Sequence, residues 1–119
     1  MLISNARSWN MDKESFMKAV SYNEKGLIPV ITQDQHTKEV LMLAWMNEEA
    51  LRLTLEKRRM VYYSRSRRKL WLKGETSGHF QNLVSISVDC DGDTLLARVI
   101  QEGAACHTGN RTCFFRSLE

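Results

Sequence analysis

Three cysteines and several aspartates lie close together in the C-terminal third of the chain. Cys90 stands within the acidic run Asp89–Asp93, and Cys106 and Cys113 follow. Three thiolates fill three of the four tetrahedral positions on a zinc ion and leave one open, which is typical of a catalytic zinc site. Carboxylates are hard donors that suit magnesium, calcium or manganese. The sequence therefore predicts a soft and a hard metal site side by side, and hydrolytic or phosphate chemistry.

Each half of this cluster also has a simpler interpretation. A turn rich in Asp and Gly needs no metal, although three carboxylates within the run Asp89–Asp93 repel one another and a bound cation relieves that repulsion. Free cysteines are often buried as small apolar residues, and Cys90 ends an apolar alternation. The chain has no C-x-x-C pair and no deaminase signature, so a zinc ribbon and a zinc deaminase are disfavoured.

A basic stretch and a glycine-containing loop precede the cluster. The stretch Lys57–Lys73 holds eight lysines and arginines and no acidic residue, and such a local field attracts phosphates. In the loop that follows, Gly74 and Gly78 flank the hydroxyls of Thr76 and Ser77, which can donate to a phosphate. A polar hairpin loop explains the same residues without a ligand, so a phosphate site remains a hypothesis here.

The bulk properties describe one domain of ordinary composition. The chain has 119 residues and a net charge of +3, so we expect a single domain over residues 1–119. Its longest apolar run, Val40–Met46, is too short to cross a bilayer, and Met1–Lys25 lacks the apolar segment of a signal peptide. An odd number of cysteines without a secretory signal disfavours a disulfide framework. We therefore expect a cytoplasmic protein.

Two helices and several short strands are expected to position these residues. An apolar stripe predicts a helix over 12–20, and Asn47 is a good N-cap for a second helix that ends near Lys57–Arg59. Strands are predicted at 27–32, 39–45, 60–64, 69–72, 83–90 and 94–101, and 106–115 is predicted to be a loop leading to a short strand. This order predicts an α+β fold, a mostly antiparallel β-sheet with two helices in one compact domain.

The strand before the acidic run alternates between apolar and polar residues. One face is expected to carry Val84, Ile86, Val88 and Cys90. If the strand continues, Cys90 and the aspartates point in opposite directions, and each residue type serves its own site. Asp91-Gly92 is also a type I′ hairpin signal, at which the alternation would break.

Four motifs carry a resemblance to one family. They are VLMLAWMNEEAL at 40–51, YYSRSRRKLWLKGETSGH at 62–79, DCDGDTLL at 89–96 and ACHTGNRTCFF at 105–115, and they cover most of the chain from about residue 27 onward. Together they resemble the phosphoribosyl-AMP cyclohydrolases of histidine biosynthesis. The resemblance implies hydrolysis of the N1–C6 bond in the adenine ring of N1-(5-phosphoribosyl)-AMP, which opens the ring and gives an aminoimidazole carboxamide.

The resemblance also implies two cofactors and a partner. Zinc is expected to be bound by Cys90, Cys106 and Cys113, and magnesium by Asp89, Asp91 and Asp93. The family works as a homodimer with the zinc site shared between subunits, so the three cysteines need not converge within one chain. Many relatives are fused to a pyrophosphohydrolase domain; because this chain ends at Glu119, it resembles the monofunctional form.

The expected roles of the remaining motif residues follow from their chemistry. His107 is our candidate general acid/base, because it stands next to a zinc ligand and imidazoles titrate near neutrality. Substrate binding is assigned to Arg65, Trp71, Lys73, Glu75, Thr76, Ser77 and His79. The substrate carries two phosphate groups, which would explain the basic residues from Arg65 to Lys73.

Two other classes of protein compete with this interpretation. A small basic nucleic-acid-binding module with a structural metal site would use Tyr62, Tyr63 and Trp71 as stacking platforms, but it leaves the rest of the metal cluster unexplained. A metal-stabilised structural protein gives no reason for the loop Lys73–His79. We therefore expect an enzyme with a small-molecule substrate, and neither a nucleic-acid nor a membrane partner.

Overall fold

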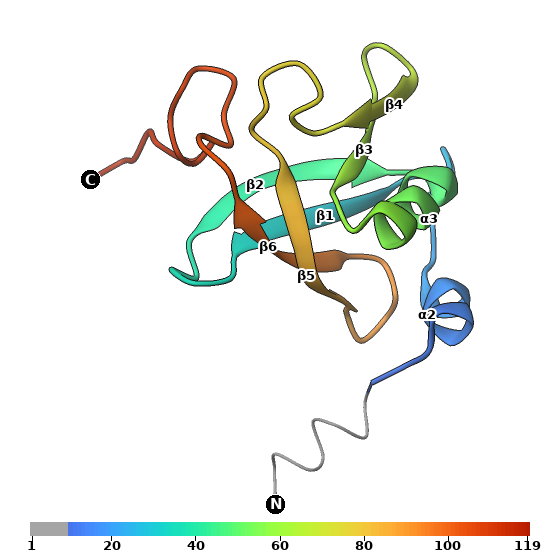
Figure 1. The fold of residues 1–119 in the computed structure, drawn as a ribbon. Coiled ribbons are helices and arrows are strands. Elements are labelled where there is room, and N and C mark those ends of the chain that lie inside the picture. Colours follow the sequence, from blue (N-terminus) through green and yellow to red (C-terminus); the bar gives the residue numbers. More distant parts are fainter. Residues whose placement is uncertain (1–9) are drawn as a thin grey trace, which may run out of the picture.

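The structure, a computed structural model, describes residues 10–119, so residues 1–9 of the polar N-terminal segment lie outside it. The described residues form two helices, α2 (Lys13–Ala19) and α3 (Glu48–Lys57), and six strands, arranged as in Figure 1. The strands are β1 (Ile28–Asp34), β2 (Val40–Met46), β3 (Val61–Ser64), β4 (Lys69–Leu72), β5 (Gln81–Val88) and β6 (Leu95–Gln101). The predicted α+β architecture is confirmed, with each predicted helix and each strand before residue 102 present within a few residues.

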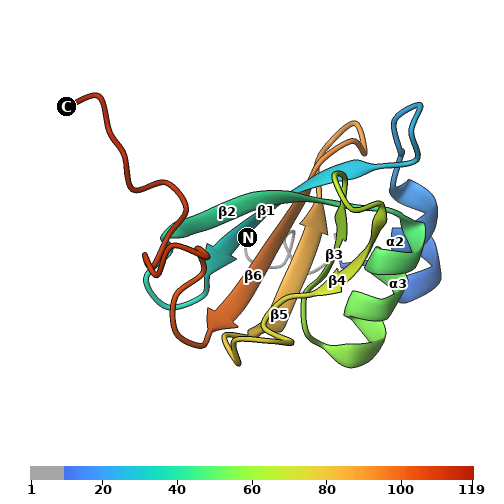
Figure 2. The same ribbon diagram turned by 90° about the horizontal axis from the view of Figure 1, so that it is seen from above.

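Four strands form the main sheet, in the order β2-β1-β6-β5. The β1–β6 pair is parallel, while the β1–β2 and β5–β6 pairs are antiparallel. Strands β3 and β4 form a separate hairpin, which Figure 2 shows beside β5 with both helices beyond it. Met60 joins the two sheets, because its N–H donates to the Gln81 carbonyl at 3.0 Å.

Helix α3 begins at the predicted N-cap Asn47, and α2 begins after Asp12, the first residue of the segment predicted to be helical. The Asp12 carboxylate accepts a hydrogen bond from the Ser15 N–H at 2.8 Å, and the Asn47 side chain accepts one from the Ala50 N–H at the same distance. These bonds satisfy amide groups that have no partner within the helix. Helix α3 ends at Arg58, which adopts a left-handed conformation.

A chain of buried polar side chains crosses the core and ends beneath the loops that follow β4 and β6. The Thr32 hydroxyl lies 2.8 Å from the Tyr62 hydroxyl, which donates to the Gln81 side chain at 2.6 Å. Gln81 in turn donates to the Gln101 side chain at 2.8 Å. Because buried polar groups are costly when unpaired, this chain fixes β1, β3, β5 and β6 relative to one another.

The structure corrects the predicted course of the strand before the acidic run. A register shift between Leu83 and Ser85 turns Val84 to solvent, while Leu83, Ile86 and Val88 pack on the core. A bulge of this kind shifts the face on which each residue lies, which alternation alone cannot reveal. The strand also ends at Val88, before Cys90.

Two further local predictions were wrong. Only the glycine of the Asp91-Gly92 pair has a positive φ, of 81°, whereas a type I′ turn needs both residues in that region. The connection instead spans residues 89–94. No strand forms within residues 106–115, which are turns and bends. As for membrane crossing, no helix within residues 10–119 has the length and apolar character to span a bilayer.

Candidate functional site

Two loops from different parts of the chain form a pocket at one end of the sheet. They are residues 73–80, between β4 and β5, and residues 102–113, after β6, which stand next to each other in Figures 1 and 2. The cavity between them has a volume of about 290 Å³ and is lined by Trp71, Lys73, Thr76, Ser77, His79, Ala104, Cys106, His107 and Gly109. Most of the predicted substrate-binding residues thus meet His107 and a predicted zinc ligand in one cavity.

Lys73 is the buried cation of this pocket. Only 6% of it is exposed, and its ammonium nitrogen lies 5.8 Å from the centre of the Trp71 ring. Burial lowers the pKa of Lys73, and the nearby thiols of Cys113 and Cys106 oppose that change. Trp71 itself packs on Tyr62, with ring centres 5.5 Å apart. The pocket therefore combines a fixed aromatic wall with a positive charge that favours an anionic partner.

His79 is enclosed by two glycines. A Cβ atom on Gly74 would lie 2.6 Å from the carbonyl carbon of His79, and one on Gly103 would lie 2.5 Å from Cδ2 of its imidazole. The His79 N–H also donates to the Ser77 hydroxyl at 3.1 Å. Both pocket loops thus pack directly against this histidine. The motif includes Gly74, but nothing in the sequence indicated that Gly103 contacts His79.

Two of the three cysteines are neighbours in the loop after β6. The Thr108 hydroxyl donates to the Cys106 sulfur at 3.0 Å, which lowers the pKa of Cys106, and the Cys113 thiol lowers it further. Burial raises the pKa of Cys113, as does its interaction with Cys106. Cys106 therefore forms thiolate more readily than an ordinary thiol, and with Cys113 beside it offers two sulfur donors for a soft metal ion.

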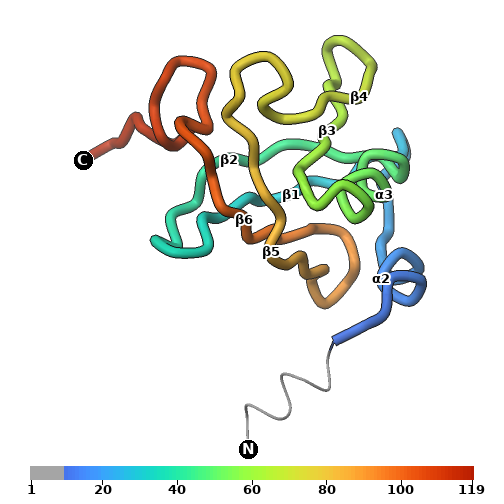
Figure 3. Tube along the Cα trace, viewed as in Figure 1, coloured from blue at the N-terminus to red at the C-terminus, as the bar shows by residue number. Residues whose placement is uncertain are grey.

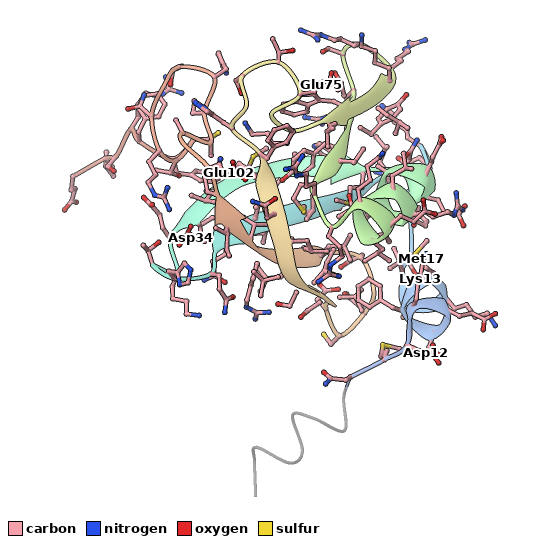
Figure 4. The ribbon with its side chains drawn as sticks, in the orientation of Figure 1. Asp12, Lys13, Met17, Asp34, Glu75 and Glu102 are labelled. Carbon is pink, nitrogen blue, oxygen red and sulfur yellow. The ribbon has the colours of Figure 1, made fainter. Side chains whose placement is uncertain are left out.

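Hydrogen bonds to the main sheet hold this cysteine loop in place. The Arg111 guanidinium lies 2.8 Å from the Asp34 carboxylate and 3.2 Å from that of Glu39. The Cys113 N–H donates to the Leu41 carbonyl of β2 at 2.7 Å. In Figure 4, Asp34 lies at the β1–β2 turn, on the same side of the molecule as Glu102 at the start of the loop. The sequence motifs did not predict this anchor.

Cys90 lies at the other end of the molecule. It follows β5, whereas Cys106 follows β6, and the antiparallel hairpin places these two points at its opposite ends (Figure 3). Strand β5 has 8 residues and β6 has 7, and a strand of such a length spans roughly 20 Å or more. Cys90 is exposed and lines a second cavity of about 640 Å³ with residues of β5 and of the segment before and within α2. Within one chain, the three cysteines do not converge.

The three aspartates gather in the turn that also carries Cys90. A ligand oxygen from each of Asp89, Asp91 and Asp93 lies within 4.8 Å of the others, the only such group of potential metal ligands within residues 10–119. Partial desolvation would raise the pKa of Asp89, but hydrogen bonds from the Asp93 and Thr94 amides keep it below its ordinary value. The interaction with Asp91 raises the pKa of Asp93. This repulsion suits a hard cation.

Glu75 and Arg65, the remaining predicted substrate-binding residues, lie outside the pocket. Glu75 lines an adjoining cavity of about 390 Å³, which shares Trp71 and Thr76 with the pocket. The guanidinium of Arg65 lies 4.7 Å above the Trp45 ring, and Arg65 lines a different cavity altogether. Tyr62 is fully buried, so it cannot stack on bases as the nucleic-acid alternative requires.

Comparisons with known proteins agree on one family. The sequence model of the phosphoribosyl-AMP cyclohydrolase family matches residues 42–115. A phosphoribosyl-AMP cyclohydrolase from Chlorobium phaeobacteroides is 55% identical over 90% of this chain and 78% of its own length. One from Prosthecochloris aestuarii is 56% identical over 94% and 82%. A histidine biosynthesis bifunctional protein from Thermoanaerobacter pseudethanolicus is 56% identical over 88% of this chain, which spans 49% of that relative.

Proposed function

Since the chain belongs to the phosphoribosyl-AMP cyclohydrolase family of histidine biosynthesis, we propose that it opens the adenine ring of N1-(5-phosphoribosyl)-AMP by hydrolysing the N1–C6 bond. The water oxygen becomes the carbonyl oxygen of a carboxamide, so both of its protons must leave. One proton reaches N1 as the N1–C6 bond breaks, and the other goes to the exocyclic nitrogen on C6 or to solvent. The protein must therefore bind a purine with two phosphate-bearing arms and move protons at C6 and N1.

The pocket between the two loops is the observation that carries this proposal. It brings an aromatic wall, a buried ammonium, two hydroxyls and two imidazoles into one cavity of about 290 Å³. Ligand sites usually measure about 300–1,000 Å³, so this cavity suits the base, with the two arms extending beyond it. The adjoining cavity, lined by Arg67 and Lys69, offers cations in the direction of one arm.

We assign the proton transfers to His107 and the orientation of the ring to its neighbours. His107 lies next to Cys106 and is exposed toward the same cavity, so it can exchange protons with a bound molecule and with solvent. Trp71 supplies a flat surface for the purine. Lys73, Thr76 and Ser77 supply donors for phosphate or ring acceptors. His79, held by two glycines, provides a second imidazole in a fixed position.

The cysteine pair supports the assignment of zinc. Cys106 and Cys113 provide two adjacent soft donors, and Cys90 would complete the set from a second copy of the chain, because its own hairpin holds it away. A zinc ion bound there would lower the pKa of water enough to supply hydroxide near neutral pH. This arrangement makes the enzyme a homodimer with a shared site, since neither subunit has all three thiols in one place.

The aspartate group supports the assignment of magnesium. Asp89, Asp91 and Asp93 offer hard oxygens close together at the surface, which is the donor type that magnesium prefers. Cys90 lies in the same turn, so a copy that contributes Cys90 to the shared zinc site also brings its aspartates near that site. A magnesium ion there would neutralise part of the charge on the substrate's phosphates.

Replacement of His107 tests the proposal. We expect His107→Asn to lower kcat by about a hundredfold or more, since general acid–base catalysis contributes 10²–10⁴-fold, while zinc content and folding stay unchanged. The matched control is His36→Asn, because His36 is exposed in the β1–β2 turn and lines no part of the pocket. Ring opening can be followed by ultraviolet absorbance. Full turnover by His107→Asn would refute its role, and no ring opening by metal-loaded wild-type protein would refute the function.

A further inference from the structure

The structure separates arginines of the stretch 57–73 by whether their guanidinium groups form hydrogen bonds with the protein. The Arg58 guanidinium donates to the Val84 carbonyl at 3.2 Å, and that of Arg59 donates to Asn82 at 3.2 Å and lies 3.9 Å above the Phe80 ring. In contrast, Arg65 and Arg68, in the β3–β4 turn, form no ion pair with any residue of 10–119. Neither charge is balanced by an acidic side chain of the described residues.

A third cation reaches the same place from a distant part of the chain. Lys25 lies in the turn before β1, and it lines a cavity of about 320 Å³ together with Leu27, Tyr63, Arg65 and Arg68. No acidic side chain lines this cavity. Lys25 also forms no ion pair within the described residues. Three like charges that converge without a counter-charge repel one another, and a bound anion relieves that repulsion.

Backbone hydrogen bonds fix the turns that carry Lys25 and Arg68, and an aromatic contact positions the guanidinium of Arg65. The Arg65 guanidinium stacks 4.7 Å above the Trp45 ring. The Arg68 N–H donates to the Ser64 carbonyl at 2.8 Å in a left-handed conformation with φ of 55°. The Lys25 N–H donates to the Asn23 side chain at 2.9 Å. Because the turns are already fixed, an anion that binds here loses little free energy to ordering the protein.

We propose that the cavity bounded by Lys25, Tyr63, Arg65 and Arg68 is a binding site for a phosphate group. Two guanidinium groups offer paired N–H donors that match phosphate oxygens, the lysine adds a third positive donor, and the Tyr63 hydroxyl can donate as well. The group belongs either to the substrate or to another phosphorylated small molecule, and the chemistry of recognition is the same for both.

This site is separate from the pocket of the same chain. The two cavities share no lining residue. Successive residues of a strand point to opposite faces, so Tyr63 faces away from Tyr62, whose ring packs on Trp71. A phosphate bound here therefore lies across the β3–β4 hairpin from the pocket in its own subunit. If it belongs to a substrate, that substrate occupies the pocket of another copy.

Inorganic phosphate is the probe for a direct binding test. Zinc-loaded protein labelled with 15N is titrated with phosphate while chloride keeps the ionic strength constant. We expect saturating amide shifts at residues 24–27 and 63–68, with millimolar affinity. Lys25→Gln and Arg68→Gln should each weaken binding by about tenfold. The matched control is Lys57→Gln, because Lys57 is an exposed lysine of the same basic stretch that lies outside the cavity. The Lys57→Gln variant should bind phosphate with the same affinity as the wild type.

Two results overturn the proposal: the absence of shifts at these residues, or equal phosphate affinity in Lys25→Gln and the wild type. Lys25 is exposed in a turn, so its replacement leaves the fold intact and the test valid. A kinetic measurement, which alone rests on the proposed function, then identifies the source. Phosphate that competes with phosphoribosyl-AMP in the wild type, and less in Lys25→Gln, indicates a substrate arm. Phosphate that binds without competing indicates a separate phosphorylated ligand.

Discussion

Gly103 lies so close to His79 that its lack of a side chain controls where the imidazole can lie. A methyl group there would meet Cδ2 at 2.5 Å and Nε2 at 2.7 Å, so the ring would have to rotate away. We therefore expect Gly103→Ala to lower kcat/KM about tenfold or more, because small misplacements of a site group can cost up to 10² in rate. Steady-state kinetics of ring opening measures this loss.

Gly26→Ala is the control that separates displacement of the His79 ring from backbone strain at a glycine with positive φ. Gly26 has a φ of 77°, against 72° for Gly103, and a Cβ atom there meets nothing within 4 Å. Both substitutions should lower the free energy of unfolding by a similar amount, about 1 kcal/mol, since an alanine is strained in this region. Only Gly103→Ala should also lower kcat/KM. Equal kinetics in the two variants would show that the position of His79 is irrelevant to turnover.

Asp91 allows the hard metal site to be tested without disturbing the soft one. Asp91→Asn keeps the shape of the side chain but removes an anionic oxygen from the aspartate group. Because zinc is assigned to thiolates, we expect its content to stay at the wild-type level, while the magnesium concentration needed for half-maximal activity rises. Metal analysis and a magnesium titration check both. Loss of zinc, or an unchanged magnesium response, would contradict the assignment of two separate sites.

The sequence could predict the chemistry of single residues better than their surroundings. Cysteines, aspartates and histidines reveal their possible roles by type and spacing. The pocket contains His107, Cys106 and most of the predicted substrate-binding residues, but not Cys90 or the aspartates. Gly103 and Asp34 could not be found in this way, because their importance comes from what folds against them. Arg65 belongs to the same motif as the pocket residues, yet it lies at another cavity, because the β3–β4 turn separates it from Trp71.

The loop after β6 contains no helix or strand, and only a few backbone hydrogen bonds close it internally, such as that from the Cys106 N–H to the Asn110 carbonyl at 3.1 Å. Its contacts with the rest of the protein therefore help to fix its position. Asp34 is its main anchor: the carboxylate binds Arg111 and also accepts hydrogen bonds from the His36 and Thr37 amides at 3.0 and 2.9 Å. Burial would raise the pKa of Asp34, but these hydrogen bonds and the Arg111 charge keep it below its ordinary value. The folded state therefore favours the ionised carboxylate.

A lowered pKa makes the stability of the protein depend on pH. The contribution of Asp34 is fully present above its unfolded-state pKa and is lost as the pH falls through its lower folded-state pKa. We expect Asp34→Asn to lower the free energy of unfolding at neutral pH by about 1–3 kcal/mol, and the difference from the wild type to shrink below about pH 4. Urea unfolding at several pH values measures this.

Glu39→Gln is the control for the Asp34 prediction. Its carboxylate also contacts Arg111, at 3.2 Å, but both side chains are substantially exposed there. Exposed ion pairs contribute little, so its stability should stay close to that of the wild type at every pH. A pH-independent difference between Asp34→Asn and the wild type would show that the ionised form of Asp34 is not the source of its effect.

The secondary-structure elements were predictable where local signals are strong. The Asn47 N-cap and most strand positions are determined by neighbouring residues, and the structure places them as the sequence indicates. The failures arise where tertiary contacts decide. The bulge after Leu83 shifts the alternation of β5, and residues 106–115 bond to the edge of β2 through a few groups instead of pairing as a strand.

For the whole molecule, the separation of Cys90 from Cys106 predicts a specific pattern of complementation. Cys90→Ala and Cys106→Ala should each be inactive. Mixed after subunit exchange, they should recover about a quarter of wild-type activity, because half of the dimers are mixed and each has one intact site of two. Activity of the mixture, compared with each variant alone, measures the recovery.

A second mixture provides the control for complementation. Cys106 and Cys113 lie in one loop, so a mixed dimer of Cys106→Ala and Cys113→Ala lacks a ligand at each site. That mixture should remain inactive at the same degree of subunit exchange. A monomeric protein in sedimentation, or recovery in both mixtures, would contradict a shared site. The sequence could not reveal this separation, since the distance between the cysteines depends on the pairing of β5 with β6.

Strand β2 is an outer strand of the sheet, and the cysteine loop covers part of its free edge. The Thr112 hydroxyl donates to the Val40 carbonyl at 2.8 Å, and the Cys113 N–H donates to that of Leu41. Beside them, Val40 and Leu43 are 43% and 47% exposed. An uncovered apolar edge of this kind pairs with other molecules and leads to aggregation. If oxidation of Cys106 or Cys113 displaces the loop, we expect the protein to lose solubility as well as activity, and a reducing buffer to prevent both losses in a stored sample.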